Sequence, residues 1–305
     1  MSGNEAMPPG TQQIDAGAAQ RQRRRLAMAE QPPWLHQEVA QRMLERLPVI
    51  KLQPSQVLQR RPSLGGGDAG LRQQYPQAVQ LWCEPDEVIR HHWQQRLKRG
   101  WMQSMLERLR GAPAPDLVAQ APAGASQLLW ANMELHAEPD KPALIRQWHE
   151  ALAVDGFLMF SCLGPDSFIE LRPLYAREGF GVPTPEWVDM HDLGDMLVHA
   201  GFADPVMDQE HLRLTWATPQ ALLSDLRALG GNVSVLRAPG LRSRAWQERL
   251  LQGLETLRGA DGRLGLSVEL VYGHAFKPQP RLKVAAQTEF SLEQMRAMVR
   301  GPGKH

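Results

Sequence analysis

Two spacings of apolar residues alternate along the middle of the chain. Short apolar runs lie at residues 56–58, 79–83, 116–118, 127–133 and 156–163. Between them, residues 68–75, 86–109 and 140–153 carry apolar residues at the spacing of a helix. Runs of this length suit buried strands, whereas apolar residues every three or four positions suit amphipathic helices. Strands that alternate with helices predict an α/β fold, a mostly parallel sheet with helices on both faces.

Similar elements are predicted on both sides of this region. Residues 34–47 have helical spacing and follow two prolines, which suits the start of a helix. On the C-terminal side, we predict helices at 189–201, 218–231 and within 243–257, and strands at 207–216 and 266–278. The sheet is therefore predicted to continue almost to the end of the chain.

The two ends of the chain lack such a pattern. Residues 1–30 are rich in glycine, glutamine, alanine and arginine, so we predict a disordered tail there. The run "RQRRR" at 21–25 could belong to a transit peptide or an arm that binds nucleic acid, but the flanking acidic residues favour a solvated tail. Residues 281–305 are predicted to form a C-terminal tail.

Composition and charge disfavour several classes of function. The 34 basic and 33 acidic residues give a net charge of +1, so no overall field recruits nucleic acid or an anionic membrane. No apolar run approaches the roughly 18–20 residues of a membrane span. Cys83 and Cys162 are too few for a disulfide framework, which predicts a cytoplasmic location. Neither the cysteines nor the ten scattered histidines have metal-ligand spacing, so no metal site is predicted.

Candidate ligand contacts lie where the predicted strands end, because open α/β sheets bind ligands at the carboxyl ends of their strands. Glu84 could accept the hydroxyls of a ribose or be a solvated acid, and spacing favours neither. The glycines at 65–67 could let the backbone approach a ligand, although a left-handed turn is the simpler interpretation. Arg60, Arg61 and Pro62 stand where the first tight glycine turn would be.

Several longer stretches resemble one enzyme family. The segments "FSCLGPDSFIELR", "VDMHDLGDMLVHAGFADPVMD", "DLRALGGN" and "VYGHAFKP" are similar to the malonyl-[acyl-carrier protein] O-methyltransferases of biotin synthesis, within the class I S-adenosylmethionine-dependent methyltransferases. The resemblance covers about residues 25–280. It implies a Rossmann-like core over 31–165, then the remaining core elements and substrate-covering segments over 166–280. S-adenosylmethionine is the implied cofactor, and an acyl carrier protein with a malonyl group is the implied partner.

The resemblance also implies cofactor contacts at Gln59, Gly65, Glu84 and Asn132. Laid on the chain without a gap, the family's first motif puts its acidic position on Gln59 and its third glycine on Gly65. Its first glycine falls on Arg61, so the chain departs from the motif there. The same alignment puts the ribose-binding acid on Glu84.

Two further positions on the cofactor side depart from the family. The segment "WANMELH" matches a family motif like "SNLALQW" and keeps Asn132, but His136 replaces its aromatic residue. No carboxylate follows Asp116 before residue 126, where the family normally supplies an acidic contact to adenine.

The implied substrate contacts are Asp189, His191, Tyr272 and His274. Asp189 and His191 stand at a helix start, where an aspartate either caps the helix or helps to shape an acyl-group pocket. Tyr272 and His274 share one face of a strand, either as a buried hydrogen-bonded pair or as donors to the substrate carboxylate.

The implied reaction needs no catalytic acid or base. A malonyl carboxylate is already ionised at neutral pH, so methyl transfer requires alignment and desolvation of the carboxylate oxygen. An acidic carrier protein would dock on a basic surface. Arginines and lysines cluster at Arg96, Lys98 and Arg99 and at Arg237, Arg242 and Arg244, and each cluster could also be a solvated face.

The chain therefore supports three hypotheses. The first is an S-adenosylmethionine-dependent methyltransferase, and the second is a catalytically silent homologue with a binding or regulatory role. The third is a site at Arg60 and Arg61 for another, anionic ligand. Two arginines could pair with the cofactor's carboxylate, but a side chain at a glycine position also fills space that the cofactor needs, and we favour this steric effect.

Overall fold

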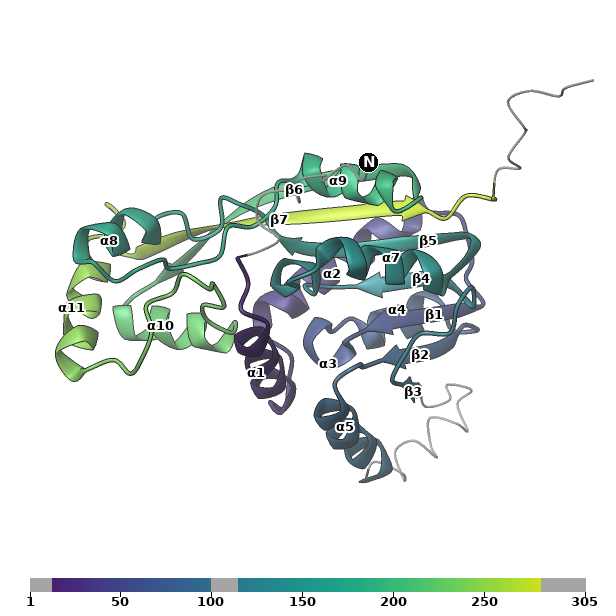
Figure 1. Ribbon diagram of the computed structural model, residues 1–305, viewed down its shortest axis with the longest axis horizontal. Coiled ribbons are helices and arrows are strands. Elements are labelled where there is room, and N and C mark those ends of the chain that lie inside the picture. The colour runs from purple at the N-terminus through teal and green to yellow at the C-terminus, as the bar shows by residue number, and fades with distance from the viewer. Residues whose placement is uncertain (1–12, 100–114, 281–305) are drawn as a thin grey trace, which may run out of the picture.

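A single sheet organises the computed structural model, which describes residues 13–99 and 115–280. Within these residues, seven strands lie in the order β3-β2-β1-β4-β5-β7-β6 (Figure 1). They are β1 (Gln56–Arg60), β2 (Val79–Cys83), β3 (Asp116–Val118), β4 (Ser126–Ala131), β5 (Leu152–Leu163), β6 (Ala203–Trp216) and β7 (Leu264–Phe276). Neighbours from β3 to β5 are parallel, whereas β7 is antiparallel to β5 and β6. The predicted α/β fold is confirmed.

Helices connect the strands, as the apolar spacing predicts. Before β5 they are α1 (Ala16–Ala27), α2 (Trp34–Arg46), α3 (Pro62–Gly65), α4 (Asp68–Gln74), α5 (Glu87–Arg99) and α7 (Lys141–Ala151), with 3-10 turns η1 (Leu47–Val49) and η2 (Leu135–Ala137). After β5 they are α8 (Leu171–Glu178), α9 (Met190–His199), α10 (Pro219–Ala228) and α11 (Arg244–Glu255). The helix predicted over 86–109 is confirmed as far as Arg99, and its remainder lies outside the described residues.

The sheet has an apolar core on each face because successive side chains of a strand point to opposite sides. In β4, Leu128 and Trp130 pack in the core that α2 and α4 cover. Leu129, between them, packs in the core that contains Trp148 of α7 and Leu197 of α9. These alternating side chains explain why the strands read as continuous apolar runs: each is buried on both faces.

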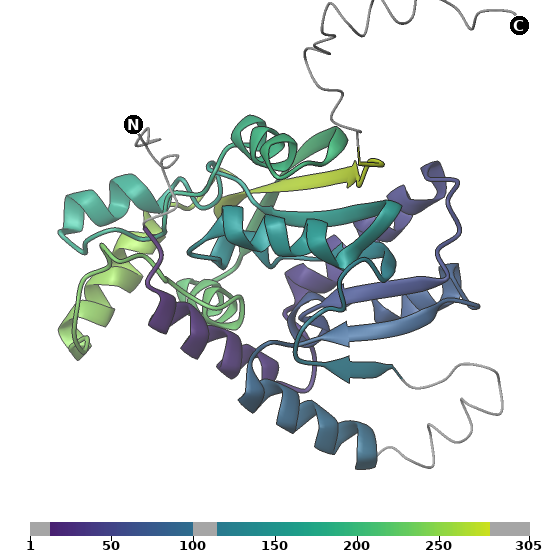
Figure 2. The same cartoon turned by 45° about the vertical axis from the view of Figure 1, so that its right-hand side comes forward.

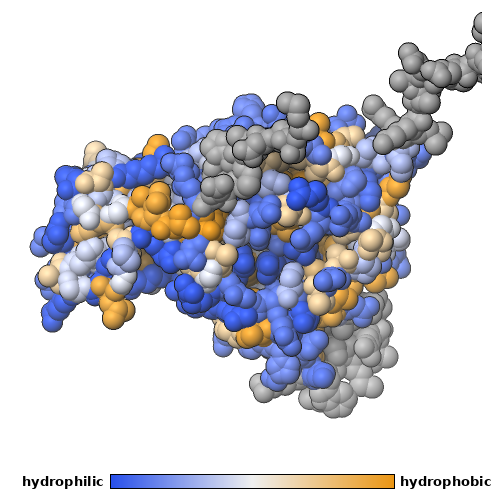
Figure 3. Space-filling view, viewed as in Figure 1, coloured by the Kyte–Doolittle hydropathy of each residue, from blue (hydrophilic) through white to orange (hydrophobic). Residues whose placement is uncertain are grey.

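The long strands β6 and β7 extend beyond the parallel part of the sheet and carry a lobe of three helices. Figure 1 shows α8, α10 and α11 together at one end of these strands. Contacts join α10 to α11 and to β6, and α11 to α8. The face shown in Figure 3 is mostly hydrophilic, and its most prominent apolar patch lies over this lobe.

Part of the predicted N-terminal tail is a packed helix, so the prediction of disorder is wrong for residues 16–27. Asp15 caps α1 by accepting a hydrogen bond from the backbone N–H of Ala18 at 2.9 Å. Arg24 of this helix pairs with Asp86 at 2.9 Å, and Ala19 and Ala27 are fully buried. Figures 1 and 2 show α1 between the lobe and the parallel part of the sheet.

Two further predictions concern membrane-spanning helices and the C-terminal tail. In the part of the chain that the structure describes, no helix is both long and apolar enough to cross a membrane. The C-terminal tail predicted at 281–305 lies outside the described residues.

Candidate functional site

The site lies where the strand order reverses, between β1 and β4. β1 pairs with β2 on one side and β4 on the other, so the connections after β1 and β4 leave the sheet around a shared crevice. Open α/β sheets bind ligands in this crevice. The segments that follow β1, β2 and β4 therefore decide what the site can hold.

The turn after β1 is rearranged into a short helix. Arg61 has left-handed backbone angles, φ 44° and ψ 54°, and Pro62 begins α3 directly after it. Gly66 and Gly67 also have positive φ, 72° and 95°, before α4 begins. The left-handed glycine turn that the sequence predicts is confirmed, but Arg61 keeps a glycine-like backbone and carries a long side chain.

Gly65 and Asn132, two of the predicted cofactor contacts, pack against each other. Asn132 donates hydrogen bonds to the backbone oxygens of Gly65 and of His36, the latter at 2.7 Å. A Cβ atom on Gly65 would lie 3.0 Å from the backbone oxygen of Asn132. The two residues are thus brought together, and they face each other rather than an open space.

Four buried charged residues fill the crevice. Arg61 bonds Glu84 through Nη1 and Glu134 through Nε, each at 2.9 Å, and Arg60 Nη2 lies 2.9 Å from Glu134. The exposed fractions of the side chains are 6% for Arg60, 9% for Arg61 and 2% for each glutamate. Two positive and two negative groups balance one another, which a buried cluster requires. We call these four residues the charged cluster.

The two glutamates of the charged cluster differ in how well their charge is stabilised. Burial acts to raise the pKa of Glu134, but Arg60 and Arg61 outweigh it and hold that pKa below its usual value. Burial raises the pKa of Glu84, although Arg61 opposes the shift. Glu84 is therefore the more weakly held carboxylate, and the interpretation of Glu84 as a solvated acid is wrong.

Gln59, the remaining predicted cofactor contact, is a buried residue at the foot of the crevice. Its side-chain amide donates hydrogen bonds to Asp68 at 2.8 Å and to Gln80 at 3.2 Å. Asp68 lies in the first turn of α4, so Gln59 ties β1 to that helix. The resemblance implies that Gln59 contacts the cofactor. In the structure, its hydrogen bonds instead hold the surrounding elements together.

An apolar cavity of about 170 Å³ lies next to the charged cluster, between the sheet and the lobe. Its apolar walls include Leu163, Phe168, Leu171, Tyr175, Trp187 and Leu226. A smaller space of about 20 Å³ reaches Arg61 and Glu134, and shares Met133 and His136 with the cavity. Sequence reasoning missed this cavity because its walls come from segments far apart along the chain.

Two histidines line both spaces and are uncharged at neutral pH. Burial lowers the pKa of His36 to about 4 and that of His136 to about 3. His36 Nδ1 lies 2.8 Å from the backbone oxygen of Leu64, and the two imidazole rings meet edge to face with centroids 6.5 Å apart. The cavity thus combines apolar walls with two neutral polar groups.

The predicted substrate contacts lie away from this cavity. Asp189 caps α9 by accepting a hydrogen bond from the backbone N–H of His191 at 2.8 Å. Tyr272 is 1% exposed, and its hydroxyl lies 3.3 Å from Glu210, while Arg46 stacks over its ring at 4.0 Å.

His274 lies two residues further along β7 and is half-buried; since Tyr272 bonds Glu210 instead, the interpretation as a hydrogen-bonded Tyr272–His274 pair is wrong. None of the four residues is among those that line the cavity, and their substrate role stays a prediction.

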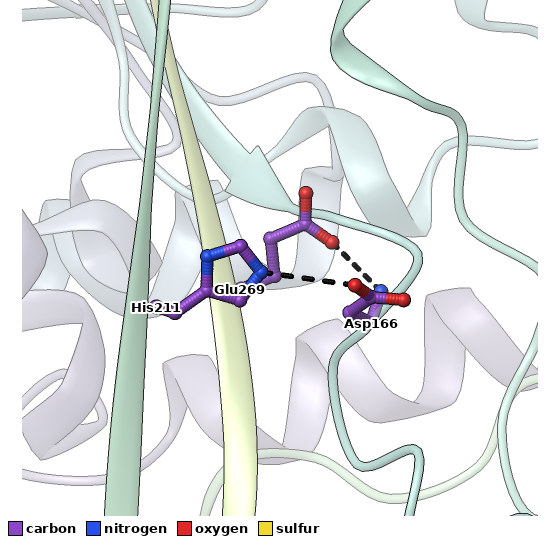
Figure 4. Close-up of side chains that lie close together, drawn as sticks. All are labelled: Asp166, His211 and Glu269. Carbon is purple, nitrogen blue, oxygen red and sulfur yellow. Dashed lines mark hydrogen bonds and ion pairs between the residues drawn. The ribbon is translucent and has the colours of Figure 1, made fainter.

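A second polar group holds the loop after β5. Asp166 from that loop, His211 of β6 and Glu269 of β7 bring potential metal-ligand atoms within 4.8 Å of one another (Figure 4). Glu269 accepts the backbone N–H of Asp166 at 2.7 Å, and Ser167 donates to the backbone oxygen of Glu269 at 3.0 Å. These bonds account for the buried Glu269, which positions the loop that leads into the cavity.

Comparison with known proteins gives the same assignment as the motifs. No family model matches the chain. A malonyl-[acyl-carrier protein] O-methyltransferase of Gallionella capsiferriformans is 40% identical over 251 residues, 81% of this chain and 86% of the relative. One of Laribacter hongkongensis is 38% identical over 258 residues, 82% and 86% of the two chains.

Among solved structures, a candidate methyltransferase from Bacillus halodurans superposes with a TM-score of 0.50 at 13% identity, covering 77% of this chain and 99% of that one. This similarity supports the Rossmann-like methyltransferase fold alone. The identity to the curated relatives, over this share of both chains, shows that the protein belongs to the malonyl-[acyl-carrier protein] O-methyltransferase family.

Proposed function

We propose that this protein methylates the free carboxylate of a malonyl group carried by an acyl carrier protein, a step of biotin synthesis, with S-adenosylmethionine as the methyl donor. The observation that carries the proposal is the 40% identity to a relative of that name over 81% of the chain. The relatives do not favour the alternative of a catalytically silent homologue, because they are named as enzymes.

The cavity suits the chemistry of this substrate. A malonyl carboxylate is ionised at neutral pH, so its methylation requires no proton removal. The walls of the cavity are mostly apolar, and His36 and His136 add polar atoms without a charge. Removing water from a carboxylate makes its oxygen a better nucleophile, and neutral donors can still orient it. A catalytic base is therefore not needed.

The basic rim of the cavity suits an acidic carrier protein. A surface groove of about 320 Å³ is lined by Arg21, Arg25 and Arg237 and shares Gln22 and Asn232 with the cavity. Of the two basic clusters that the sequence suggests, only Arg237 of the second lines this groove. We propose that the carrier protein docks here, so that its prosthetic arm reaches the cavity beside α1.

We also propose a cytoplasmic location. Cys83 and Cys162 are both free and buried, which suits a reducing compartment.

The implied cofactor does not fit the crevice as the structure has it. The carboxylate of Glu84, which the family resemblance assigns to the ribose, already bonds Arg61. The space beside Arg61 is about 20 Å³, enough for about one water molecule. Cofactor binding therefore requires side chains of the charged cluster to move.

Mass spectrometry of a malonyl-loaded acyl carrier protein tests the proposed function. We expect the protein, at saturating S-adenosylmethionine, to add one methyl group to the malonyl carrier. An acetyl-loaded carrier is the matched control, because it lacks the free carboxylate and should stay unmodified. The proposal fails if a form of the protein that binds the cofactor leaves the malonyl carrier unmethylated.

A further inference from the structure

We infer that Arg61 competes with the cofactor for Glu84, so that this chain blocks its own cofactor site and binds S-adenosylmethionine only when the Arg61 side chain leaves. The inference rests on the proposed function for the identity of the cofactor. Arg61 is a position at which the chain departs from the family motif. The inference follows from the backbone angles of Arg61, its hydrogen bonds and the small space around its charged side chain.

The backbone directs the Arg61 side chain into the crevice. Arg61 directly follows β1, and its backbone N–H donates to the backbone oxygen of Cys83 at 2.9 Å. Its φ of 44° is one that glycine adopts readily and that other residues rarely adopt. The turn thus has the conformation of a glycine turn, but a guanidinium occupies the volume that a glycine would leave open.

The contacts of Arg61 use the carboxylate that a ribose would need. Arg61 Nη1 donates to Glu84 Oε1 at 2.9 Å, and the backbone N–H of Asp86 donates to the same oxygen at 3.0 Å. The other oxygen, Oε2, has no hydrogen-bond partner but is buried, and Glu84 as a whole is only 2% exposed, so a ligand cannot reach this carboxylate in the present arrangement. A ribose hydroxyl can bond Glu84 only after the guanidinium has moved.

Arg61 is the side chain whose removal would free Glu84, although Gln22, Arg23 and Leu26 of α1 also line the space beside it. Leu64 and Gly65 of α3 are buried, and Gly65 packs closely on Asn132. Arg60 bonds Glu134 through two nitrogens, at 2.9 and 3.3 Å, independently of Arg61. Removal of the Arg61 side chain would therefore leave the Arg60–Glu134 pair intact and free the carboxylate of Glu84.

Titration calorimetry with S-adenosylhomocysteine, the product form of the cofactor, tests the inference. We compare the wild type with Arg61→Gly, which suits the left-handed backbone, and with Arg61→Lys, which keeps a cation near Glu84. Arg61→Gly should bind at least about tenfold more tightly than the wild type, because the ligand no longer displaces a buried ion pair. Arg61→Lys should resemble the wild type.

A double variant shows whether Glu84 receives the ligand. Arg61→Gly combined with Glu84→Gln should lose most of the gained affinity, since the carboxylate that accepts the ribose is then absent. Equal affinities of the wild type and Arg61→Gly would overturn the inference, as would a gain that survives the loss of Glu84. If Arg61→Gly does not fold, Arg61→Asn provides the comparison, because asparagine also adopts left-handed angles and its amide can still bond Glu84 without a charge.

The outcome is separable from that of the proposed function. A variant that binds S-adenosylhomocysteine more tightly yet never methylates a malonyl carrier supports the block by Arg61 and refutes the proposed substrate. A wild type that binds as tightly as Arg61→Gly and methylates the carrier supports the proposed function and refutes the block.

Discussion

Two glycines show how a single missing side chain can have opposite effects on stability. A Cβ atom on Gly164 would lie 2.4 Å from the carboxyl carbon of Glu269, which is buried and bonded to the loop after β5. A Cβ atom on Gly194, inside α9, would meet only the Met207 side chain, at 3.6 Å. The first position excludes a methyl group, whereas the second accepts one.

We therefore predict that Gly164→Ala lowers the free energy of unfolding by about 1–3 kcal/mol, the usual effect of overpacking. Gly194→Ala should raise it by up to about 1 kcal/mol, because alanine favours a helix interior over glycine. Urea denaturation of both variants checks the pair. A Gly164→Ala protein as stable as the wild type would show that Glu269 moves aside freely.

Single residues also mark the limit of what the sequence could predict about the site. The position of Glu84 at a strand end was predictable, because an apolar run of strand length ends directly before it. Its pairing with Arg61 was not, since the pair depends on a left-handed turn and on Glu134, which the order of elements does not place. Steric exclusion at Arg61 was foreseen, but the carboxylates that hold the side chain were not.

At the scale of the elements, helix α9 allows a test of two interpretations of Asp189. Asp189 caps this helix, yet the family resemblance also suggests a role in substrate binding. Asp189→Ala should lower the free energy of unfolding by about 1 kcal/mol, because it removes the acceptor for a free backbone N–H. Asp189→Asn should keep that acceptor and most of the stability.

The same two variants test the substrate role by their KM for the malonyl carrier. If Asp189 only caps the helix, Asp189→Asn leaves the KM unchanged. A raised KM in a fully stable Asp189→Asn protein would instead assign the carboxylate to the substrate site.

The element that the sequence failed to predict is α1. Its run of arginines is typical of a solvated segment, and its buried stripe is narrow: Ala19, Leu26 and Ala27. The helix is held by contacts with distant residues: Arg24 with Asp86, and Arg25 with the backbone oxygen of Gly230 at 2.5 Å. Polar tertiary contacts of this kind add nothing to the apolar pattern, which two alanines and one leucine leave weak.

At the scale of the whole molecule, the parallel part of the sheet was predictable and the cavity was not. Buried strands such as β4 and β5 are apolar on both faces, so each one appears as a continuous run. The cavity forms only where the lobe meets the sheet, and its walls include both Leu226 of α10 and Phe168 of the loop after β5. No local spacing relates these two residues, so their meeting depends on the complete fold.

Two buried histidines beside this cavity, His36 and His136, make the stability of the fold depend on pH. Their pKa values fall from 6.5 to about 4 and about 3, because burial disfavours the charged imidazole. Below pH 6.5 the unfolded chain therefore binds protons that the folded chain does not. Stability should fall as the pH drops from about 6.5 toward 4, by up to about 1.4 kcal/mol per pH unit for each histidine.

Urea unfolding between pH 7.5 and 5 measures how stability depends on pH. The variant His136→Phe shows how much of that dependence comes from His136. Phenylalanine keeps an aromatic ring at the cavity but cannot take up a proton in the unfolded chain. The variant should therefore lose the part of the slope that His136 contributes, while His36, His149 and His274, whose pKa values burial also lowers, are common to both proteins. The raised pKa of Glu84 has the opposite effect on how stability changes with pH. Both proteins contain Glu84, so its contribution cancels when their slopes are compared. Equal slopes for wild type and variant would mean that His136 takes up a proton as readily in the folded protein as in the unfolded chain, and that burial does not lower its pKa.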